Sequence, residues 1–261
     1  MAERKSVAII GVGGEFPSSP TLERYWENIV NNINTSRRPP QDRWLLPPDA
    51  VYAPEVGAVD KVYSQKACFL DDEPDCSGIS GLDLDPDFVQ QLDPMFRLLL
   101  RVGRQTLSGL QTDKIKRPTS GVIIGNLALP SEKSSQLARH LLGQAFVEKL
   151  PSDAITVSDQ PVAAVNHYVA GLPAALLAKA IGFQGTCFTV DAACASSLYA
   201  IKLAADELLS GRADSMLAGG LSRPDSLYTQ MGFSQLRALS PSPGFSTFIT
   251  CAPMLDSNLP Q

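Results

Sequence analysis

The sequence predicts an α/β fold with a largely parallel sheet. Short runs of apolar and β-branched residues, typical of buried strands, occur at residues 6–12, 121–126, 185–190 and 214–219. Helix-like stretches separate these runs along the chain. Strands that alternate with helices in this way indicate a sheet that is mostly parallel and covered by helices.

The composition is that of a globular protein. The chain has 261 residues, of which 44% are hydrophobic and 19% charged, and this length can bury a sizeable core as one domain. The formal net charge of −5 argues against a nucleic-acid-binding surface, which needs a basic field. The basic cluster of Lys114, Lys116 and Arg117 is typical of a solvated helix end, although an acidic carrier protein could use it.

The cysteines and the N-terminal residues favour a cytoplasmic location. Five cysteines is an odd count, without a pairing pattern or Cys-x-x-Cys spacing, which favours reduced thiols over a disulfide framework or a zinc site. The apolar run near the N-terminus is too short for a signal peptide, and no stretch is long enough to cross a membrane. We therefore expect neither a metal site nor a membrane anchor.

The first apolar run ends in Gly11-Val12-Gly13-Gly14, but this is not a dinucleotide-binding loop. The pattern G-x-G-x-x-G needs glycine where Phe16 stands, and Pro17 follows where a helix should continue. Residues 21–33 have the spacing of an amphipathic helix. The prolines of residues 35–80 exclude long helices, so we expect there a long irregular excursion that packs as a cover.

Helix signals recur in the middle of the chain. Asp93 is a candidate N-cap, and Pro94 fits the first turn of the helix that follows it. A second helical stretch covers residues 134–150. A third opens at Leu172-Pro173 and closes at Gly182, which is the proline-first, glycine-last asymmetry of helices.

The stretch from Gly185 to Tyr199 predicts a short buried strand that turns sharply into a helix, with Cys194 at the turn. Gly211 is expected to close that helix, whose apolar circumference predicts central burial. A thiol at a helix N-terminus is close to the positive end of the dipole and to unpaired N–H groups, which favour a thiolate and can stabilise an oxyanion. These are the properties of an acyl-carrying cysteine.

The other four cysteines are predicted to be small buried hydrophobes. They are Cys68, Cys76, Cys187 and Cys251.

The residues around Cys194 repeat a family signature. Asp191-Ala-Ala-Cys194-Ala-Ser-Ser197 resembles the active-site stretch of β-ketoacyl synthases, and Leu217-Ala-Gly-Gly220 and Leu239-Ser-Pro241 fall where that family has Ala-Gly-Gly and Leu-Ser-Pro. Other stretches resemble landmarks of the family as a whole, of its modular synthases, or of synthases of the polyunsaturated-fatty-acid and heterocyst-glycolipid type. They are Gly11–Pro17, Arg43-Trp44, Asp60–Phe69, Leu92–Leu100 and Asn126–Pro130.

This resemblance implies a thiolase-like, layered α/β/α fold of which residues 5–244 form only the N-terminal half, followed by an atypical tail at residues 245–261. It implies that Cys194 takes an acyl chain from the phosphopantetheine of an acyl carrier protein. Decarboxylative Claisen condensation with a malonyl-type extender would follow, without another cofactor. The partners implied are the acyl carrier protein and a second copy of the chain or other synthase domains.

Condensation in this family also uses two histidines, in stretches like His-Gly-Thr-Gly-Thr and Asn-x-Gly-His. The two histidines of this sequence, His140 and His167, have neither context. Three hypotheses therefore stay open. The chain is a ketosynthase segment, or a truncated, non-condensing fragment or interaction module of such a synthase, or a cysteine hydrolase that pairs Cys194 with His140 or His167. The last ranks lowest, because the order of the family motifs would then be coincidence.

Overall fold

The computed structural model describes residues 6–41, 43–44, 46–70, 79, 81–147, 171–223 and 226–240. Contacts divide the chain into two compact units. The first, here called the sheet unit, falls within residues 1–14 and 73–223, and the second, the cover unit, within residues 15–72 and 224–261.

A three-stranded parallel sheet with the order β2-β1-β3 forms the centre of the sheet unit. The strands are β1 (Ser120–Asn126), β2 (Cys187–Val190) and β3 (Ser215–Leu221), and Ile123 of β1 is paired with Phe188 of β2 and with Ala218 of β3. The predicted parallel sheet is therefore confirmed for the strands expected near residues 121–126, 185–190 and 214–219. All three strands point the same way, so their carboxyl ends lie at one edge.

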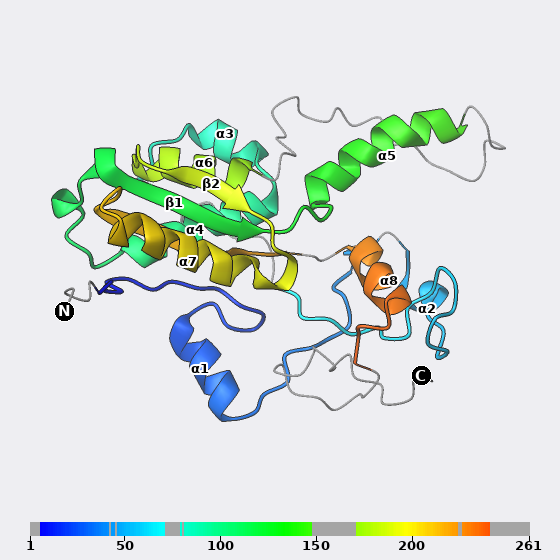
Figure 1. Cartoon of the computed structure of the whole chain (residues 1–261). Helices are drawn as coiled ribbons and strands as arrows, with labels where there is room; N and C mark the ends of the chain where they lie inside the picture. The colour runs from blue at the N-terminus through cyan, green and yellow to red at the C-terminus, as the bar shows by residue number, and fades with distance from the viewer. Residues whose placement is uncertain are drawn as a thin grey trace, which may run out of the picture. The chain divides into compact units, whose positions relative to one another are not determined.

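Helices α6 (Leu172–Ile181) and α7 (Ser196–Leu209) lie on opposite faces of this sheet (Figure 1). Ile123 is fully buried against Ala200 and Ala204 of α7. Successive strand residues point to opposite faces, and Thr189 points to the other side, where its Oγ1 accepts a hydrogen bond from the N–H of Ala174 in α6. The layered α/β/α arrangement is thus confirmed.

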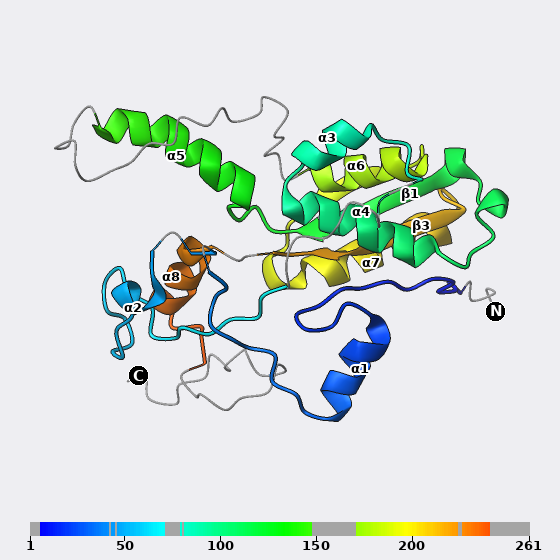
Figure 2. The same cartoon turned by 180° about the vertical axis from the view of Figure 1, so that it is seen from behind.

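Helices α3 (Pro86–Gln91) and α4 (Pro94–Leu107) complete the side of the sheet that α6 covers (Figure 2). Asp93 caps α4 as predicted and accepts the N–H of Met95 at 2.9 Å. Its second oxygen accepts the N–H of Lys133 at 2.9 Å, at the start of α5 (Glu132–Val147). One buried carboxylate therefore ties together the beginnings of two helices.

The predicted buried strand at residues 6–12 is wrong. These residues have no regular secondary structure, and the side chains of Ile9 and Ile10 are 84% and 65% exposed. A Cβ atom added to Gly11 or Gly13 would come within 2.5 Å of Thr106 in α4, so this segment lies against that helix. An apolar run becomes a strand only beside a paired neighbour, and within the described residues this run has none.

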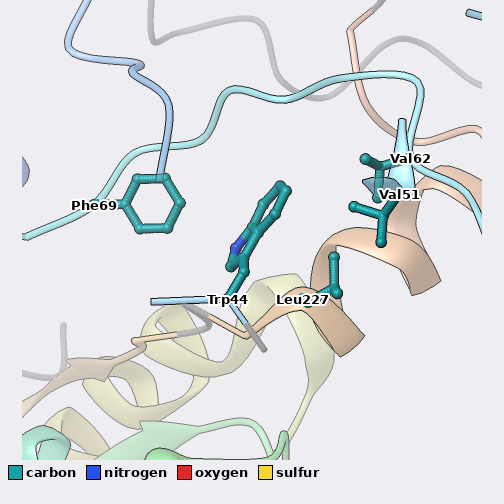
Figure 3. Packing of buried hydrophobic residues seen from close by; sticks show 5 residues of the cluster. All are labelled: Trp44, Val51, Val62, Phe69 and Leu227. Atoms are coloured by element: carbon teal, nitrogen blue, oxygen red, sulfur yellow. The ribbon is translucent and has the colours of Figure 1, made fainter. Parts of the chain in front are cut away.

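The cover unit contains α1 (Leu22–Val30), α2 (Pro48–Val51) and α8 (Leu227–Gln235). Its small core joins parts of the chain that are far apart in sequence (Figure 3). The core residues are Trp44, Val51, Val62, Phe69 and Leu227.

Hydrogen bonds from α8 hold the irregular segment within residues 35–80. Gln230 Nε2 donates to the carbonyl oxygens of Ser64 and Lys66 at 3.0 and 3.3 Å. After the helix, the carbonyl oxygen of Leu239 accepts the Tyr63 hydroxyl at 2.6 Å. The sequence did not predict α8, whose contacts explain how such a proline-rich stretch is held in place.

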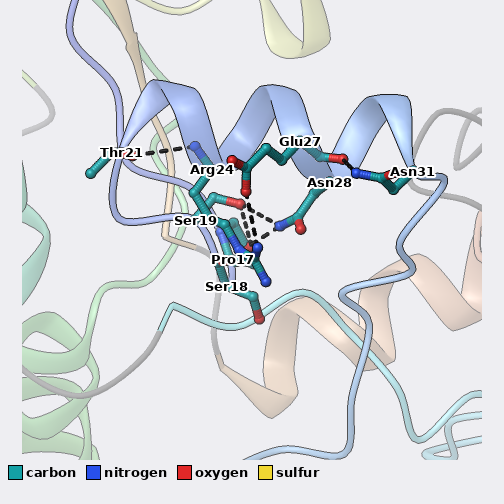
Figure 4. Close-up of polar contacts among 8 residues, drawn as sticks. All are labelled: Pro17, Ser18, Ser19, Thr21, Arg24, Glu27, Asn28 and Asn31. Atoms are coloured by element: carbon teal, nitrogen blue, oxygen red, sulfur yellow. Dashed lines mark hydrogen bonds and ion pairs between the residues drawn. The ribbon is translucent and has the colours of Figure 1, made fainter.

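The predicted helix within residues 21–33 is present as α1 and is held largely by polar contacts (Figure 4). The Thr21 side chain caps it, and the buried Asn28 donates to Ser19 Oγ at 2.8 Å. Phe16 and Tyr25 stack with ring centroids 4.0 Å apart, whereas Trp26 is 65% exposed.

Two further findings concern the chain as a whole. Within the ranges that the structure describes, no helix is both long and apolar enough to cross a membrane. The expected tail at residues 245–261 lies outside the described residues, as do Cys76, Cys251 and His167.

Candidate functional site

Cys194 lies where the chain passes from β2 into α7. The strand ends at Val190, a 3-10 turn η4 covers Ala193–Ala195, and α7 begins at Ser196. The predicted sharp turn from strand to helix is therefore confirmed. Cys194 is exposed at the carboxyl edge of the sheet, which is the edge at which open α/β sheets bind their ligands.

The backbone at this turn is unusual. Ala193, the residue before Cys194, has φ +49°, a left-handed conformation that costs about 1–2 kcal/mol for a residue with a Cβ. Strain of this kind persists only where surrounding contacts hold the backbone, and it concentrates at functional sites.

Two side chains supply those contacts. Ser196, which is buried, accepts the N–H of Ala192 at 2.9 Å and donates its hydroxyl to the carbonyl oxygen of Ala193 at 2.6 Å. Asp191 accepts the N–H of Ala193 through Oδ1 at 2.9 Å and the N–H of Ala128 through Oδ2 at 3.2 Å. The turn is thus fixed both within itself and to the segment after β1.

Glycines on the sheet let the start of α7 come close. A Cβ added to Gly125 of β1 would lie 2.4 Å from the carbonyl carbon of Ser196, and one added to Gly220 of β3 would lie 2.8 Å from the Cβ of Ser197. Real Cβ contacts of that length essentially never occur. Small residues on the strands therefore decide how deeply the helix that follows Cys194 sits against the sheet.

Cys194 lies directly before the start of α7. Its neighbour Ala195 is the N-cap residue of α7, no side chain caps the helix, and its first turn contains no acidic residue. The positive end of the helix dipole therefore lies directly after the thiol. At Cys187, desolvation by the surrounding protein raises the pKa of the thiol above its ordinary value.

The prediction that Cys68 and Cys187 are buried is wrong, since both residues are exposed. Cys187 belongs to β2, which is an edge strand of the described sheet, and β2 is exposed or half-buried along its length rather than buried as predicted. Cys68 lies in the irregular part of the cover unit.

The predicted central burial of the Cys194 helix is also wrong. The sheet buries one side of α7, at Ser196, Ala200 and Ala204. Leu198 is 68% exposed and Ile201 is 52% exposed. Gly211, with φ +74°, follows the C-cap Ser210 as predicted.

His140 lies within α5, and its Nδ1 atom is buried without a hydrogen-bond partner among the described residues. A Cys194–His140 pair of the hydrolase type through Nδ1 is therefore not formed. Among the residues that the structure describes, no cluster of three or more His, Cys, Asp or Glu residues is placed to hold a metal ion.

Asp191 and Ser196 belong to the sequence motif, but the motif did not predict their hydrogen bonds. The spacing of Asp191 and Ala193 is typical of an Asx turn, and this signal could have predicted one of the two hydrogen bonds of the carboxylate. The other bond joins residues 63 positions apart, which no local pattern reports.

The family follows from comparison with known proteins. The family model "Beta-ketoacyl synthase, N-terminal domain" matches residues 4–251. This match takes in nearly the whole sequence, so the chain belongs to the β-ketoacyl synthase N-terminal domain family. The resemblance read from the motifs is confirmed.

Curated relatives are much longer than this chain. The non-reducing polyketide synthase stmB of Aspergillus ustus is 29% identical over 95% of this chain and 11% of its own length. A phenolphthiocerol/phthiocerol polyketide synthase of Mycobacterium tuberculosis is 29% identical over 93% of this chain and 12% of its own length.

Solved structures agree on the fold. The PfaC keto synthase–chain length factor has a TM-score of 0.74 and 31% identity, over 88% of this chain and 26% of that chain. A point mutant of the ketosynthase from module 6 of the bacillaene synthase of Bacillus subtilis 168 has a TM-score of 0.68 and 24% identity, over 90% of this chain and 35% of that chain. The fold is therefore the thiolase-like α/β fold of ketosynthases, as predicted.

Proposed function

We propose that this chain accepts an acyl group on Cys194 as the N-terminal ketosynthase segment of a polyketide or fatty-acid synthase. The observation that carries the proposal is the placement of Cys194, exposed at the start of α7 and inside the family motif. The left-handed Ala193 before it and the uncapped helix after it support the same role.

The proposed transfer needs a thiolate and an oxyanion site. The Cys194 sulfur attacks the thioester carbonyl carbon of an acyl chain on the phosphopantetheine arm of a carrier protein. The tetrahedral oxyanion collapses as the carbon–sulfur bond to the arm breaks, and the released thiolate of the arm takes up a proton. Backbone N–H groups at the start of α7 would be the donors for that oxyanion.

Condensation would then use the acylated cysteine. A malonyl-type extender loses carbon dioxide, its enolate carbon attacks the Cys194 thioester, and a 3-oxoacyl product leaves with regeneration of the thiol. The charge that develops on the extender must be stabilised by preorganised donors. The histidine stretches that the family uses for this are not within these 261 residues, so the proposed condensation requires residues from outside this sequence.

The partners proposed are an acyl carrier protein, other synthase domains and a second copy of the chain. β2 is an edge strand of the described sheet and exposes Cys187 and Phe188, and an open edge favours pairing with another strand. The proposed location is the cytoplasm, in keeping with exposed cysteines that are free thiols in the described residues.

The alternative is a non-condensing fragment or interaction module of such a synthase. One experiment separates the two. The purified chain is given an acyl thioester and a malonyl carrier protein, and acyl-protein, carbon dioxide and 3-oxoacyl product are followed for the wild type and for Cys194→Ala.

The expected result is slow acylation that depends on Cys194, with no condensation by this chain alone. Absence of any acylation would favour the interaction module. Product formation that depends on Cys194, with no second protein added, would overturn the requirement for outside residues.

A further inference from the structure

The Asp191 carboxylate holds two backbone segments that meet at the carboxyl edge of the sheet. Its Oδ1 atom accepts the N–H of Ala193 at 2.9 Å, and its Oδ2 atom accepts the N–H of Ala128 at 3.2 Å. Ala193 directly precedes Cys194, and Ala128 belongs to the irregular segment between β1 and α5.

These two contacts act on the strained point of the turn. Ala193 has φ +49°, and its N–H is one of the two groups that Asp191 fixes. Ser196 fixes the other side of the same residue by donating to the Ala193 carbonyl oxygen. Of these two side chains, Asp191 is the one that also reaches the segment leaving β1.

We propose that Asp191 is a positioning residue for Cys194, which sets the direction of the thiol by clamping the turn to the segment after β1. It would act through backbone geometry and would not touch the acyl group. The inference rests on the proposed function, because it takes Cys194 as the acyl acceptor. Displacement of a reacting atom by about 1 Å can cost a factor of about 100 in rate, so such a clamp would matter to the acylation step.

The two variants of Asp191 differ in a useful way. In Asp191→Asn, the amide oxygen can still accept from the N–H of Ala193, but the amide NH₂ would face the N–H of Ala128 as donor against donor. This variant keeps the turn and loses the clamp. In Asp191→Ala both hydrogen bonds are lost.

Asp85 offers a matched control in the same unit. Its Oδ1 atom accepts the N–H of Asp87 at 2.8 Å, which is the same contact to the second residue along the chain, at the start of α3. Asp85→Asn and Asp85→Ala therefore test whether loss of any such contact in the sheet unit affects Cys194.

The experiment measures single-turnover acylation of the full chain by the butyryl thioester of N-acetylcysteamine, as a function of thioester concentration and pH. For Asp191→Ala we expect the maximal rate to fall by roughly ten- to a hundredfold, with the half-saturating concentration unchanged. Asp191→Asn should lie between Asp191→Ala and the wild type, and both Asp85 variants should match the wild type. A pH midpoint that shifts while the maximal rate at high pH stays the same would show a charge effect and contradict positioning, as would an unchanged maximal rate in Asp191→Ala.

Amide hydrogen exchange tests, independently of acylation, whether Asp191 joins the turn to the segment after β1. In Asp191→Ala we expect faster exchange in peptides covering residues 126–130 and 191–196 together, and in Asp191→Asn chiefly in residues 126–130. Exchange that stays at the wild-type rate in residues 126–130 of both variants would overturn the inference. If the wild type is not acylated at all, the proposed function fails, and the exchange result alone decides whether Asp191 clamps the turn.

Discussion

At the scale of single residues, Cys194 and Cys187 have different surroundings although both are exposed. Cys194 stands before the uncapped first turn of α7, whereas desolvation raises the pKa of the Cys187 thiol above its ordinary 9.0. Because the thiolate is the nucleophile, we predict that an acyl-chain-like epoxide labels Cys194 before Cys187 at neutral pH. Peptide mass spectrometry over time gives the order.

The pH dependence sharpens this prediction. A raised pKa leaves less Cys187 thiolate at any given pH, so labelling of Cys187 should reach its midpoint above pH 9.0. Exposed Cys68 in the cover unit is the internal reference. Equal labelling of Cys194, Cys187 and Cys68 at neutral pH would contradict the special position of Cys194.

At the scale of elements, the packing of α7 on β1 depends on the absence of a side chain at Gly125. A Cβ there would lie 2.4 Å from the backbone of Ser196. We predict that Gly125→Ala lowers the free energy of unfolding by about 1–3 kcal/mol, as overpacking does, and slows reactions of Cys194. Urea unfolding and thiol labelling measure the two effects.

Gly219 is the matched control for this substitution. It lies in β3, paired with Ile124, and a Cβ added there would meet nothing within 4 Å. Gly219→Ala should be neutral or slightly stabilising, because alanine restricts the unfolded chain. Equal losses of stability in the two variants would show that close approach to Ser196 is not the cause.

Hydrogen bonds of Glu207 stabilise the C-terminal end of α7. Its carboxylate accepts hydrogen bonds from Nε and Nη2 of Arg212 at 3.1 and 2.8 Å, and from the Thr186 hydroxyl at 3.0 Å. Hydrogen bonds from these two residues hold the pKa of Glu207 below its ordinary 4.5. Those from Arg212 have the larger effect and the one from Thr186 the smaller. A carboxylate whose pKa is lowered on folding stabilises the fold above its unfolded pKa, and this contribution is lost as the pH falls through the folded value.

We therefore predict that Glu207→Gln is less stable than the wild type at about pH 7 and that the difference shrinks as the pH falls below 4.5. Urea unfolding midpoints of both proteins across this pH range measure the difference. A gap in stability that is the same at pH 7 and in acid would mean that the carboxylate charge of Glu207 contributes nothing.

Local signals predicted elements well where a short segment decides the outcome. β1, the Asp93 cap and the ends of α6 and α7 follow from caps, glycines and β-branched runs within a few residues. The strand at residues 6–12 and the burial of β2 were wrong because both depend on neighbours from elsewhere in the chain. α8 was missed although Ser226 caps it locally, and its contact with Ser64 spans 166 positions.

In the candidate site, too, the local features were predicted and the long-range contacts were not. The strand, the turn and the helix around Cys194 were predicted from one continuous stretch, and the family motif picked out the cysteine. The contact from Asp191 to Ala128 and the close approach of Gly125 to Ser196 join segments distant in sequence. Those parts of the site became visible only in three dimensions.

At the scale of the whole molecule, the sheet unit exposes many large apolar side chains. Ile9 is 84%, Leu198 68% and Ile201 52% exposed, and surfaces of this kind promote association. We predict that the chain alone associates or unfolds with poor cooperativity. Light scattering with a thermal melt tests this, and a sharp, reversible melt of a monomer would count against it.

Two variants test whether the exposed side of α7 causes the association. The double substitution Leu198→Ser and Ile201→Ser should reduce association, because it removes apolar area from the exposed side of α7. Val59→Ser removes one side chain that is 79% exposed in the cover unit and should leave association unchanged. If all three proteins associate equally, the face of α7 is not responsible.

The central claim is that Cys194 is the residue that receives the acyl group. The most direct measurement is incubation of the full chain with the butyryl thioester of N-acetylcysteamine, followed by protein and peptide mass spectrometry that maps the added butyryl group. We predict a single butyryl group on Cys194 in the wild type and none in Cys194→Ala, while Cys187→Ala is acylated like the wild type. An acyl group on another residue, or one that persists in Cys194→Ala, would contradict the claim.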